Sequence, residues 1–285
     1  MVRPELPTRS IDEAVAALGK APFEAWCAVE MPSVATTSMR LSVQTRGDAH
    51  ELFWNDPVQI LRGCLLVSRF GCAIEPETLQ MMTSHKVRLA HEPAERVGKA
   101  VEDLLYGSFV HDALTETVDV LVAALPEVAA CRNFDQHTPY HIYDVWEHIA
   151  WVVQYSPATP LARWAALLHD IGKPAACFME GKRAHFKGHA RLSVALARNV
   201  MERFRVEPSL AEQIILLVKM HDTAIEATPE GVLSAIEKLG GDTELFRSLC
   251  ILKRADALAH SDLAIPRLRL SYDLERVLDE LIAKR

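Results

Sequence analysis

Apolar residues recur at intervals of three and four through most of this 285-residue chain, a spacing that places them along one face of an α-helix. Between Asp56 and Gly71, Pro57 stands at the first helical position, an apolar stripe follows, and the glycine is suited to end the helix. Asp56 is the expected N-cap of this helix. The same reasoning predicts helices in the first half of the chain over residues 10–18, 56–70, 76–85, 93–106 and 110–125.

The second half has the same helical pattern, and its caps support it. Thr159-Pro160 opens one predicted helix, and Ser209 followed by Glu212 predicts a capping box for another. Residues 34–43 are rich in Ser and Thr and fit either a strand or a loop, whereas strand signals are nearly absent after residue 56. We therefore expect an all-α fold, with second-half helices over residues 140–155, 160–170, 190–205, 209–221, 230–239, 243–260 and 271–284.

Two features predict how the chain divides. Pro126 and the polar run 132–138 interrupt the helical pattern and mark a boundary. We expect an N-terminal segment of unclear fold at residues 1–50, a helical domain at 51–130 and a second helical domain at 131–285.

Composition narrows the functional classes. Hydrophobic residues make up 49% and charged residues 24%, as in ordinary globular proteins. The net charge of −7 gives no general attraction for nucleic acid or anionic membrane, so no extended nucleic-acid surface is expected. The sequence shows neither a membrane-spanning run nor a secretory signal. Six cysteines without a Cys-x-x-Cys pair indicate reduced thiols and a cytoplasmic location. The oligomeric state stays open.

Candidate chemistry lies on the apolar stripes of the second half. An apolar run, Ala165 to Leu168, leads directly into an adjacent histidine and aspartate. Other helices each carry one similar side chain in phase with their apolar face, and imidazole and carboxylate are ligands for divalent metals. A buried carboxylate is costly unless it is paired or metal-bound. The candidate ligands are His148, His169, Asp170, His189, His221 and Asp256.

Simpler interpretations exist for each residue taken alone. A single histidine on an apolar stripe is more often a core residue, and Asp256 alone would pair with Arg254 or cap a turn. Their joint placement favours a shared metal site in a helical bundle. A zinc finger is excluded by the absence of paired cysteines, and a serine hydrolase is disfavoured because no Gly-x-Ser-x-Gly elbow occurs.

The order of these ligands, with Gly172 and Lys173 after the His-Asp pair, resembles the HD-domain metal-dependent phosphohydrolases. The resemblance extends to bacterial CCA-adding tRNA nucleotidyltransferases, whose neck and C-terminal HD domain it would cover from about residue 46 to 262. It is carried by residues 56–71, Glu95-Arg96, residues 140–148 and residues 185–189. It implies a helical neck followed by an HD-domain bundle.

One departure concerns the polymerase head of that family, which holds magnesium on a Gly-Ser and an Asp-x-Asp pair. This sequence contains no Asp-x-Asp, and its one Gly-Ser is Gly107-Ser108, within the neck-like region. The roughly 45 residues before the neck are also too few for that head. We therefore expect no tRNA-terminus-adding activity from this chain.

The resemblance implies how the ligands would be used. A first metal ion would be bound by His148, His169, Asp170 and Asp256. His189 and His221 would bind a second, with Asp170 bridging, although a one-metal site is the alternative. Neutral imidazole suits Mn, Fe, Co, Ni or Zn better than Mg, which stays a candidate.

The same resemblance gives roles in catalysis and substrate binding. Asp170 would be catalytic through its bridging position, and Lys173 would be a point charge on a phosphate oxygen, or else a solvated lysine. Further candidate substrate contacts are His185, Lys187 and Arg254.

The expected function is that of a metal-dependent phosphohydrolase, either a phosphodiesterase or a phosphatase. Its substrate would be the phosphoester of a nucleotide or an RNA end, with a 2′,3′-cyclic phosphate among the candidates. Two alternatives stay open: a tRNA- or RNA-binding module with a vestigial HD site, and a hydrolase of a signalling nucleotide such as a guanosine polyphosphate.

Overall fold

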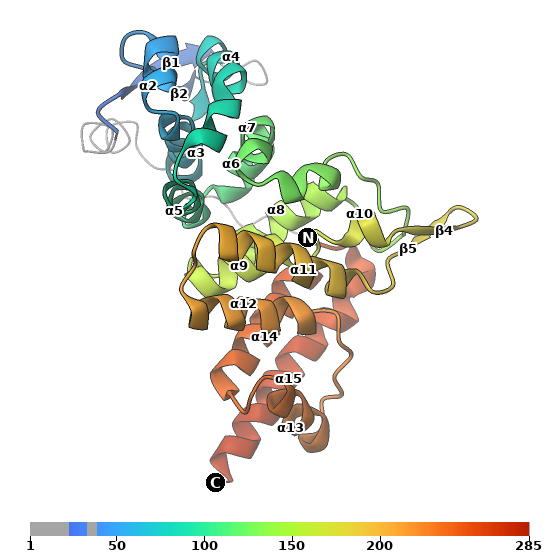
Figure 1. The fold of residues 1–285 in the computed structure, drawn as a ribbon. Helices are drawn as coiled ribbons and strands as arrows, with labels where there is room; N and C mark the ends of the chain where they lie inside the picture. Colours follow the sequence, from blue (N-terminus) through green and yellow to red (C-terminus); the bar gives the residue numbers. More distant parts are fainter. Residues whose placement is uncertain (1–22, 33–38, 285) are drawn as a thin grey trace. The chain divides into compact units, whose positions relative to one another are not determined.

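The computed structural model describes residues 23–32 and 39–284 (Figure 1). The helix predicted over residues 10–18 lies outside this part of the chain. The molecule divides into two compact units, Met1–Pro126 and Glu127–Arg285. The three-part division expected from the sequence stays a prediction. Among the described residues, none of the helices combines the length and the apolar character needed to cross a bilayer.

The first unit contains a small three-stranded sheet. Strand β1 (Trp26–Pro32) pairs antiparallel with β2 (Met39–Thr45), and β3 (Ala73–Ile74) lies parallel to β2. The Ser/Thr-rich segment that fitted either a strand or a loop is thus a strand from residue 39. Trp26 is fully buried, and its indole N–H donates to the side-chain oxygen of Gln59 at 3.2 Å.

Helices form the rest of the first unit. Gly71 ends α3 in the left-handed conformation, with φ 63°, as the sequence predicted. Asp56 is not the N-cap of α3, because its carboxylate accepts hydrogen bonds from the side chains of Gln59 and Arg96 instead. The elements are α2 (Ala49–Asn55), α3 (Val58–Phe70), α4 (Pro76–His85), the 3-10 turn η1 (Lys86–His91), α5 (Ala94–Leu105), α6 (Val110–Glu116) and α7 (Val118–Ala124). The 3-10 turn η2 (Pro126–Cys131) begins at the last residue of this unit and belongs mainly to the second.

The single helix predicted over residues 110–125 is wrong, because the chain breaks at Thr117 into α6 and α7. Thr117 has φ −114° and ψ 20°, outside the helical range. Its buried hydroxyl donates to the carbonyl of Ala113 at 2.7 Å, so the side chain competes with the backbone for a helical acceptor.

The second unit is a helical bundle with one hairpin. Helices α8, α9, α12 and α14 pack on one another, α11 covers α9 and α12, and α15 lies along α14 (Figure 1). The expected all-α class is confirmed, with only small strands added. The elements are α8 (Val145–Tyr155), α9 (Pro160–Leu168), α10 (Lys173–Ala176), β4 (Phe178–Glu180), β5 (Arg183–His185), α11 (His189–Arg203), α12 (Pro208–Met220), α13 (Pro229–Lys238), α14 (Thr243–Leu258), the 3-10 turn η3 (Asp262–Ala264) and α15 (Ile265–Ala283).

Helix starts account for most differences from the sequence predictions in this unit. Helix α8 begins five residues later than predicted, because Asp144 caps it. The predicted capping box at Ser209 is wrong, since Glu207 accepts from the backbone N–H groups of Ser209 and Leu210 and is itself the N-cap. Helix α15 begins at Ile265 rather than at residue 271, and the β4–β5 hairpin was not predicted.

Candidate metal centre

Helix ends deliver most of the candidate ligands to one point. His169 and Asp170 follow on α9, His221 follows directly on α12, and His189 begins α11. Two further ligands come from within helices, His148 from α8 and Asp256 from α14. Each helix buries its apolar face against its neighbours, so the side chains in phase with those faces converge. All six predicted ligands are therefore brought together, in two groups that share Asp170.

Asp170 stands at the centre of the cluster, and its two oxygens face different ligands. Oδ2 lies 3.1 Å from Nε2 of His169 and 3.4 Å from Nε2 of His148. Oδ1 lies 3.1 Å from Nε2 of His189 and 3.4 Å from Nε2 of His221. Asp256 completes the first group, with Oδ1 3.0 Å from Nε2 of His148. This is the arrangement expected of a carboxylate that bridges two cation sites.

Backbone carbonyls fix the orientation of the imidazole rings. Nδ1 of His169, His189 and His221 lies 2.7–2.8 Å from the carbonyls of Ala166, Phe186 and Val218 respectively. A carbonyl accepts, so each Nδ1 carries a proton, and each Nε2 faces the cluster as the nitrogen that would coordinate a cation. His148 is held more loosely, with Nδ1 3.4 Å from the carbonyl of Ala259.

The donor set fits divalent metal ions. Nε2 of His189 and Nε2 of His221 lie 3.0 Å apart, and two lone pairs at this distance repel unless a cation or a proton lies between them. Nε2 of His169 and Oδ1 of Asp170 are buried and make no hydrogen bond of regular geometry, although each lies 3.1 Å from a polar atom of the cluster. Unsatisfied buried acceptors of this kind are costly, and coordination to a cation would satisfy them.

The electrostatics of the cluster also favour a bound positive charge. Burial acts to raise the pKa of Asp170, but His169 and Lys173 outweigh it and hold this pKa well below its usual range. Burial acts to lower the pKa of His169, yet Asp170 raises it to about 10. The carboxylates are thus ionised at neutral pH, and the centre attracts a proton or a metal ion.

Lys173 is buried and belongs to the centre itself. Its ammonium lies 2.6 Å from Oδ2 of Asp170 and donates to the side-chain oxygen of Gln136 at 2.8 Å. It also lies 3.2 Å from Nε2 of His141. The solvated lysine considered as an alternative is therefore wrong, because the side chain is enclosed and paired with the bridging carboxylate.

Gly172 lets the His-Asp turn approach α11. A Cβ at this position would lie 2.5 Å from the backbone nitrogen of Ser193 and 2.6 Å from the carbonyl oxygen of His189. The N–H of Gly172 donates to the hydroxyl of Ser193 at 3.0 Å. Only glycine fits this close approach, which sets the distance between Asp170 and His189.

A cleft of about 230 Å³ opens onto the centre. Of the residues predicted to contact substrate, Lys173 and Lys187 line it. His185 lies on β5 with Nε2 3.2 Å from a carboxylate oxygen of Glu180, and Arg254 pairs with Glu275 and stacks over Tyr272. Neither of the last two lines the cleft. Its wall is formed by His141, Asp170, Lys173, Phe186, Lys187, His189, His221, Asp222, Asp256, His260 and Arg267.

Several residues around the centre were not predicted from the sequence. His141 and His260 have ring centroids 4.4 Å apart, and both pack against the ring of His148. Burial lowers the pKa of His260 to about 4, so this ring is neutral. The ammonium of Lys253 donates to the carbonyls of His221 and Thr223. His141 could have been predicted from the sequence, because it lies in residues 140–148, one of the segments that carry the resemblance.

Comparisons with known proteins agree with this geometry. Residues 139–260 match the family model of the HD domain. A multifunctional CCA protein of Azoarcus sp. (strain BH72) is 30% identical over 218 residues, which are 72% of this chain and 48% of that protein. A CC-adding tRNA nucleotidyltransferase of Thermus thermophilus is 30% identical over 234 residues, or 77% of this chain and 52% of that protein.

A solved structure shows the same fold. The crystal structure of the Bacillus stearothermophilus CCA-adding enzyme in complex with CTP matches with a TM-score of 0.55 at 20% identity. The match covers 84% of this chain and 51% of that one. This chain thus spans about half the length of the relatives it matches.

Proposed function

We propose that this chain is a metal-dependent phosphohydrolase. The premise is that it carries an HD domain and resembles the neck and HD portion of bacterial CCA-adding tRNA nucleotidyltransferases. The observation that carries the proposal is Asp170, whose two oxygens each face a separate group of histidine nitrogens. Its substrate would be a phosphoester of a nucleotide or an RNA end.

Two divalent ions would be held by the two groups. His148, His169, Asp170 and Asp256 would hold one, and Asp170, His189 and His221 the other. Such ions supply Lewis acidity, which polarises a phosphoryl oxygen and lowers the pKa of water. A donor set of four imidazoles and two carboxylates favours Mn, Fe, Co, Ni or Zn over Mg.

The chain's own residues orient the reaction. Lys173 donates to Asp170 and holds its carboxylate between the two groups, while Gln136 fixes the ammonium from the other side. Lys187, at the cleft wall, would bind a non-bridging phosphate oxygen. In the net reaction one water adds to phosphorus, one P–O ester bond breaks, and the leaving oxygen takes a proton. A cyclic diester thus yields one monoester.

The alternatives differ in what supports them. An RNA-binding module with a vestigial site is disfavoured because all six ligands are present and converge. The name of the Thermus thermophilus relative refers to tRNA, so the expectation of no extended nucleic-acid surface gains no support from it. A guanosine polyphosphate hydrolase stays a second candidate, since the cleft would accept any phosphoryl group. The six free thiols fit the cytoplasmic location expected from the sequence.

Metal content and hydrolysis of Asp170→Asn test the proposal. The amide has the shape of the carboxylate but lacks its charge, so we expect the variant to lose most bound metal and its hydrolysis of model phosphoesters. Metal would be measured by mass spectrometry after loading with Mn²⁺, Co²⁺ or Zn²⁺. Asp262→Asn, an exposed aspartate outside the cleft, is the matched control. Unchanged metal content in Asp170→Asn would overturn the site assignment.

A further inference from the structure

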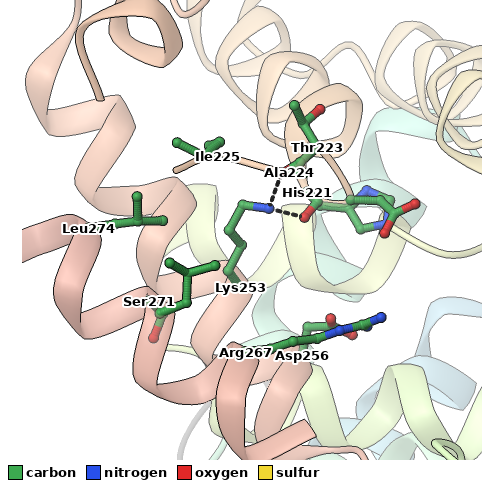
Figure 2. Close-up of a pocket in the computed structure, with 11 residues that line it drawn as sticks. His221, Thr223, Ala224, Ile225, Lys253, Asp256, Arg267, Ser271 and Leu274 are labelled. Carbon is green, nitrogen blue, oxygen red and sulfur yellow. Dashed lines mark hydrogen bonds between the residues drawn. The ribbon is translucent and has the colours of Figure 1, made fainter. Parts of the chain in front are cut away.

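A side cavity of about 230 Å³ adjoins the metal centre between α14, α15 and the loop after α12 (Figure 2). It shares four wall residues with the cleft: His221, Asp222, Asp256 and Arg267. Two of these are metal-ligand candidates, so the cavity and the cleft meet at the edge of the centre. When the phosphoryl group of a substrate lies in the cleft, the part of the substrate that is bonded to this phosphoryl group would therefore reach the side cavity.

The wall of the side cavity combines apolar side chains with polar and charged ones. Ile225 and Leu274 face it in Figure 2, and Leu270 lies at its rim with 37% of its surface exposed. The ammonium of Lys253 reaches its back wall, where it donates to the carbonyls of His221 at 2.6 Å and Thr223 at 2.8 Å. These carbonyls take two of the three N–H donors of the ammonium, and the carboxylates of Asp222 and Asp256 lie in the same wall, so the cavity suits an uncharged ring with polar edges rather than an anion.

Arg267 is the cation at the junction of the two spaces. It is exposed, comes from the first turn of α15, and lines both the cleft and the side cavity. Its guanidinium lies 5.5 Å from the ring centroid of Tyr140. A planar cation in this place is suited to hold a phosphate oxygen while the rest of the ligand continues into the cavity.

We propose that the side cavity binds the base of a mononucleotide whose phosphate lies at the metal centre, and that Arg267 binds the phosphate at their junction. The assignment rests on the proposed hydrolase function and selects one of its substrate classes. A volume of about 230 Å³ is below the range of roughly 300–1,000 Å³ for drug-sized ligands, which leaves room for one base. The net charge of −7 disfavours a longer RNA chain.

The test compares three cyclic phosphates on the full-length, metal-loaded protein. Adenosine 2′,3′-cyclic phosphate and ethylene phosphate share the five-membered cyclic ester, but only the first carries a nucleoside. An RNA tetramer with the same cyclic end is the third. We expect kcat/KM for the adenosine ester to exceed that for ethylene phosphate by at least about tenfold, as pocket contacts commonly give. Equal values for these two, or a preference for the tetramer, would overturn the assignment.

Two variants locate the base and the phosphate. Leu270→Trp fills the rim of the cavity, and we expect it to lower kcat/KM for the adenosine ester at least about tenfold more than that for ethylene phosphate. Leu233→Trp, on an exposed leucine that lines neither space, is the control. Arg267→Ala should weaken binding of adenosine 3′-monophosphate by about 10- to 100-fold without weakening that of adenosine. Arg269→Ala, two residues on, is its control.

Equilibrium dialysis of adenosine separates failure of this inference from failure of the proposed function. If the protein hydrolyses none of the three esters and none of the model phosphoesters used with Asp170→Asn, the hydrolase proposal fails. Adenosine binding that Leu270→Trp abolishes and Leu233→Trp leaves intact still supports the side cavity in that case. Hydrolysis of all three esters with no adenosine binding would overturn the side cavity and leave the hydrolase proposal standing.

Discussion

Replacement of Gly172 by alanine tests whether the turn after the His-Asp pair sets the geometry of the second ligand group. Gly172 has φ −83° and ψ −8°, a conformation that alanine adopts without strain. Without a collision, Gly172→Ala would therefore stabilise the protein by about 0.4–1 kcal/mol through the unfolded state. The sign of the measured change thus reports on the contact with α11.

The structure predicts a collision. The new Cβ would lie 2.5 Å from the nitrogen of Ser193 and 2.6 Å from the carbonyl oxygen of His189, and both are backbone atoms. Ordinary separation, roughly 3.5 Å, requires a displacement of about 1 Å. Overpacking of this kind costs about 1–3 kcal/mol, so we expect net destabilisation and a Tm lower by about 2–12 °C.

The displacement should affect the two ligand groups unequally. The start of α11 carries His189, whose Nε2 lies 3.1 Å from Oδ1 of Asp170, whereas the first group has no ligand on α11. We expect Gly172→Ala to retain about one equivalent of metal and to lose about 100-fold in rate, as a misplacement of 1 Å commonly costs. Mass spectrometry of the loaded protein and thermal unfolding would measure both effects.

Ser193→Ala provides the control. It removes the hydroxyl that accepts from the N–H of Gly172 but adds no bulk, so it should cost about 1–3 kcal/mol while both metal equivalents remain. A Gly172→Ala protein as stable as the parent, with its full metal content, would refute the close approach of this turn to α11.

Four further predictions concern the metal centre, the missing Asp-x-Asp pair and the buried cysteines. His221→Ala should keep about one equivalent of metal and lose most hydrolysis; one equivalent in the saturated parent protein would contradict the two-metal site. Lys253→Met should weaken the second metal more than the first, because its ammonium binds the carbonyl of His221, whereas Lys219→Met, on an exposed lysine of α12, should change neither. The chain alone should not extend a tRNA 3′ end with labelled CTP or ATP, because it lacks an Asp-x-Asp pair. Burial raises the thiol pKa to about 12 for Cys64, Cys131 and Cys250. These thiols are therefore protonated at pH 8, and a thiol reagent should label them only after the protein unfolds.

The amino-acid sequence by itself determined most of the helices and all six candidate ligands. Prolines, glycines and apolar periodicity mark where helices begin and end, and these signals act within a few residues. The phase of a side chain on its helix decides whether it points toward the core. His148, His221 and Asp256 share the phase of their apolar stripes, so their convergence was predictable once the helices formed a bundle.

Tertiary structure decided how the remaining polar groups are used. Lys173 is buried because Gln136 and His141, more than thirty residues away, lie against it. Arg254 turns to Glu275 on α15, while Arg267 from that helix reaches the cleft. Periodicity fixes the direction of a side chain within its own helix. It carries no information about which distant segment packs there, and that long-range packing assigns each charge its partner and creates the side cavity.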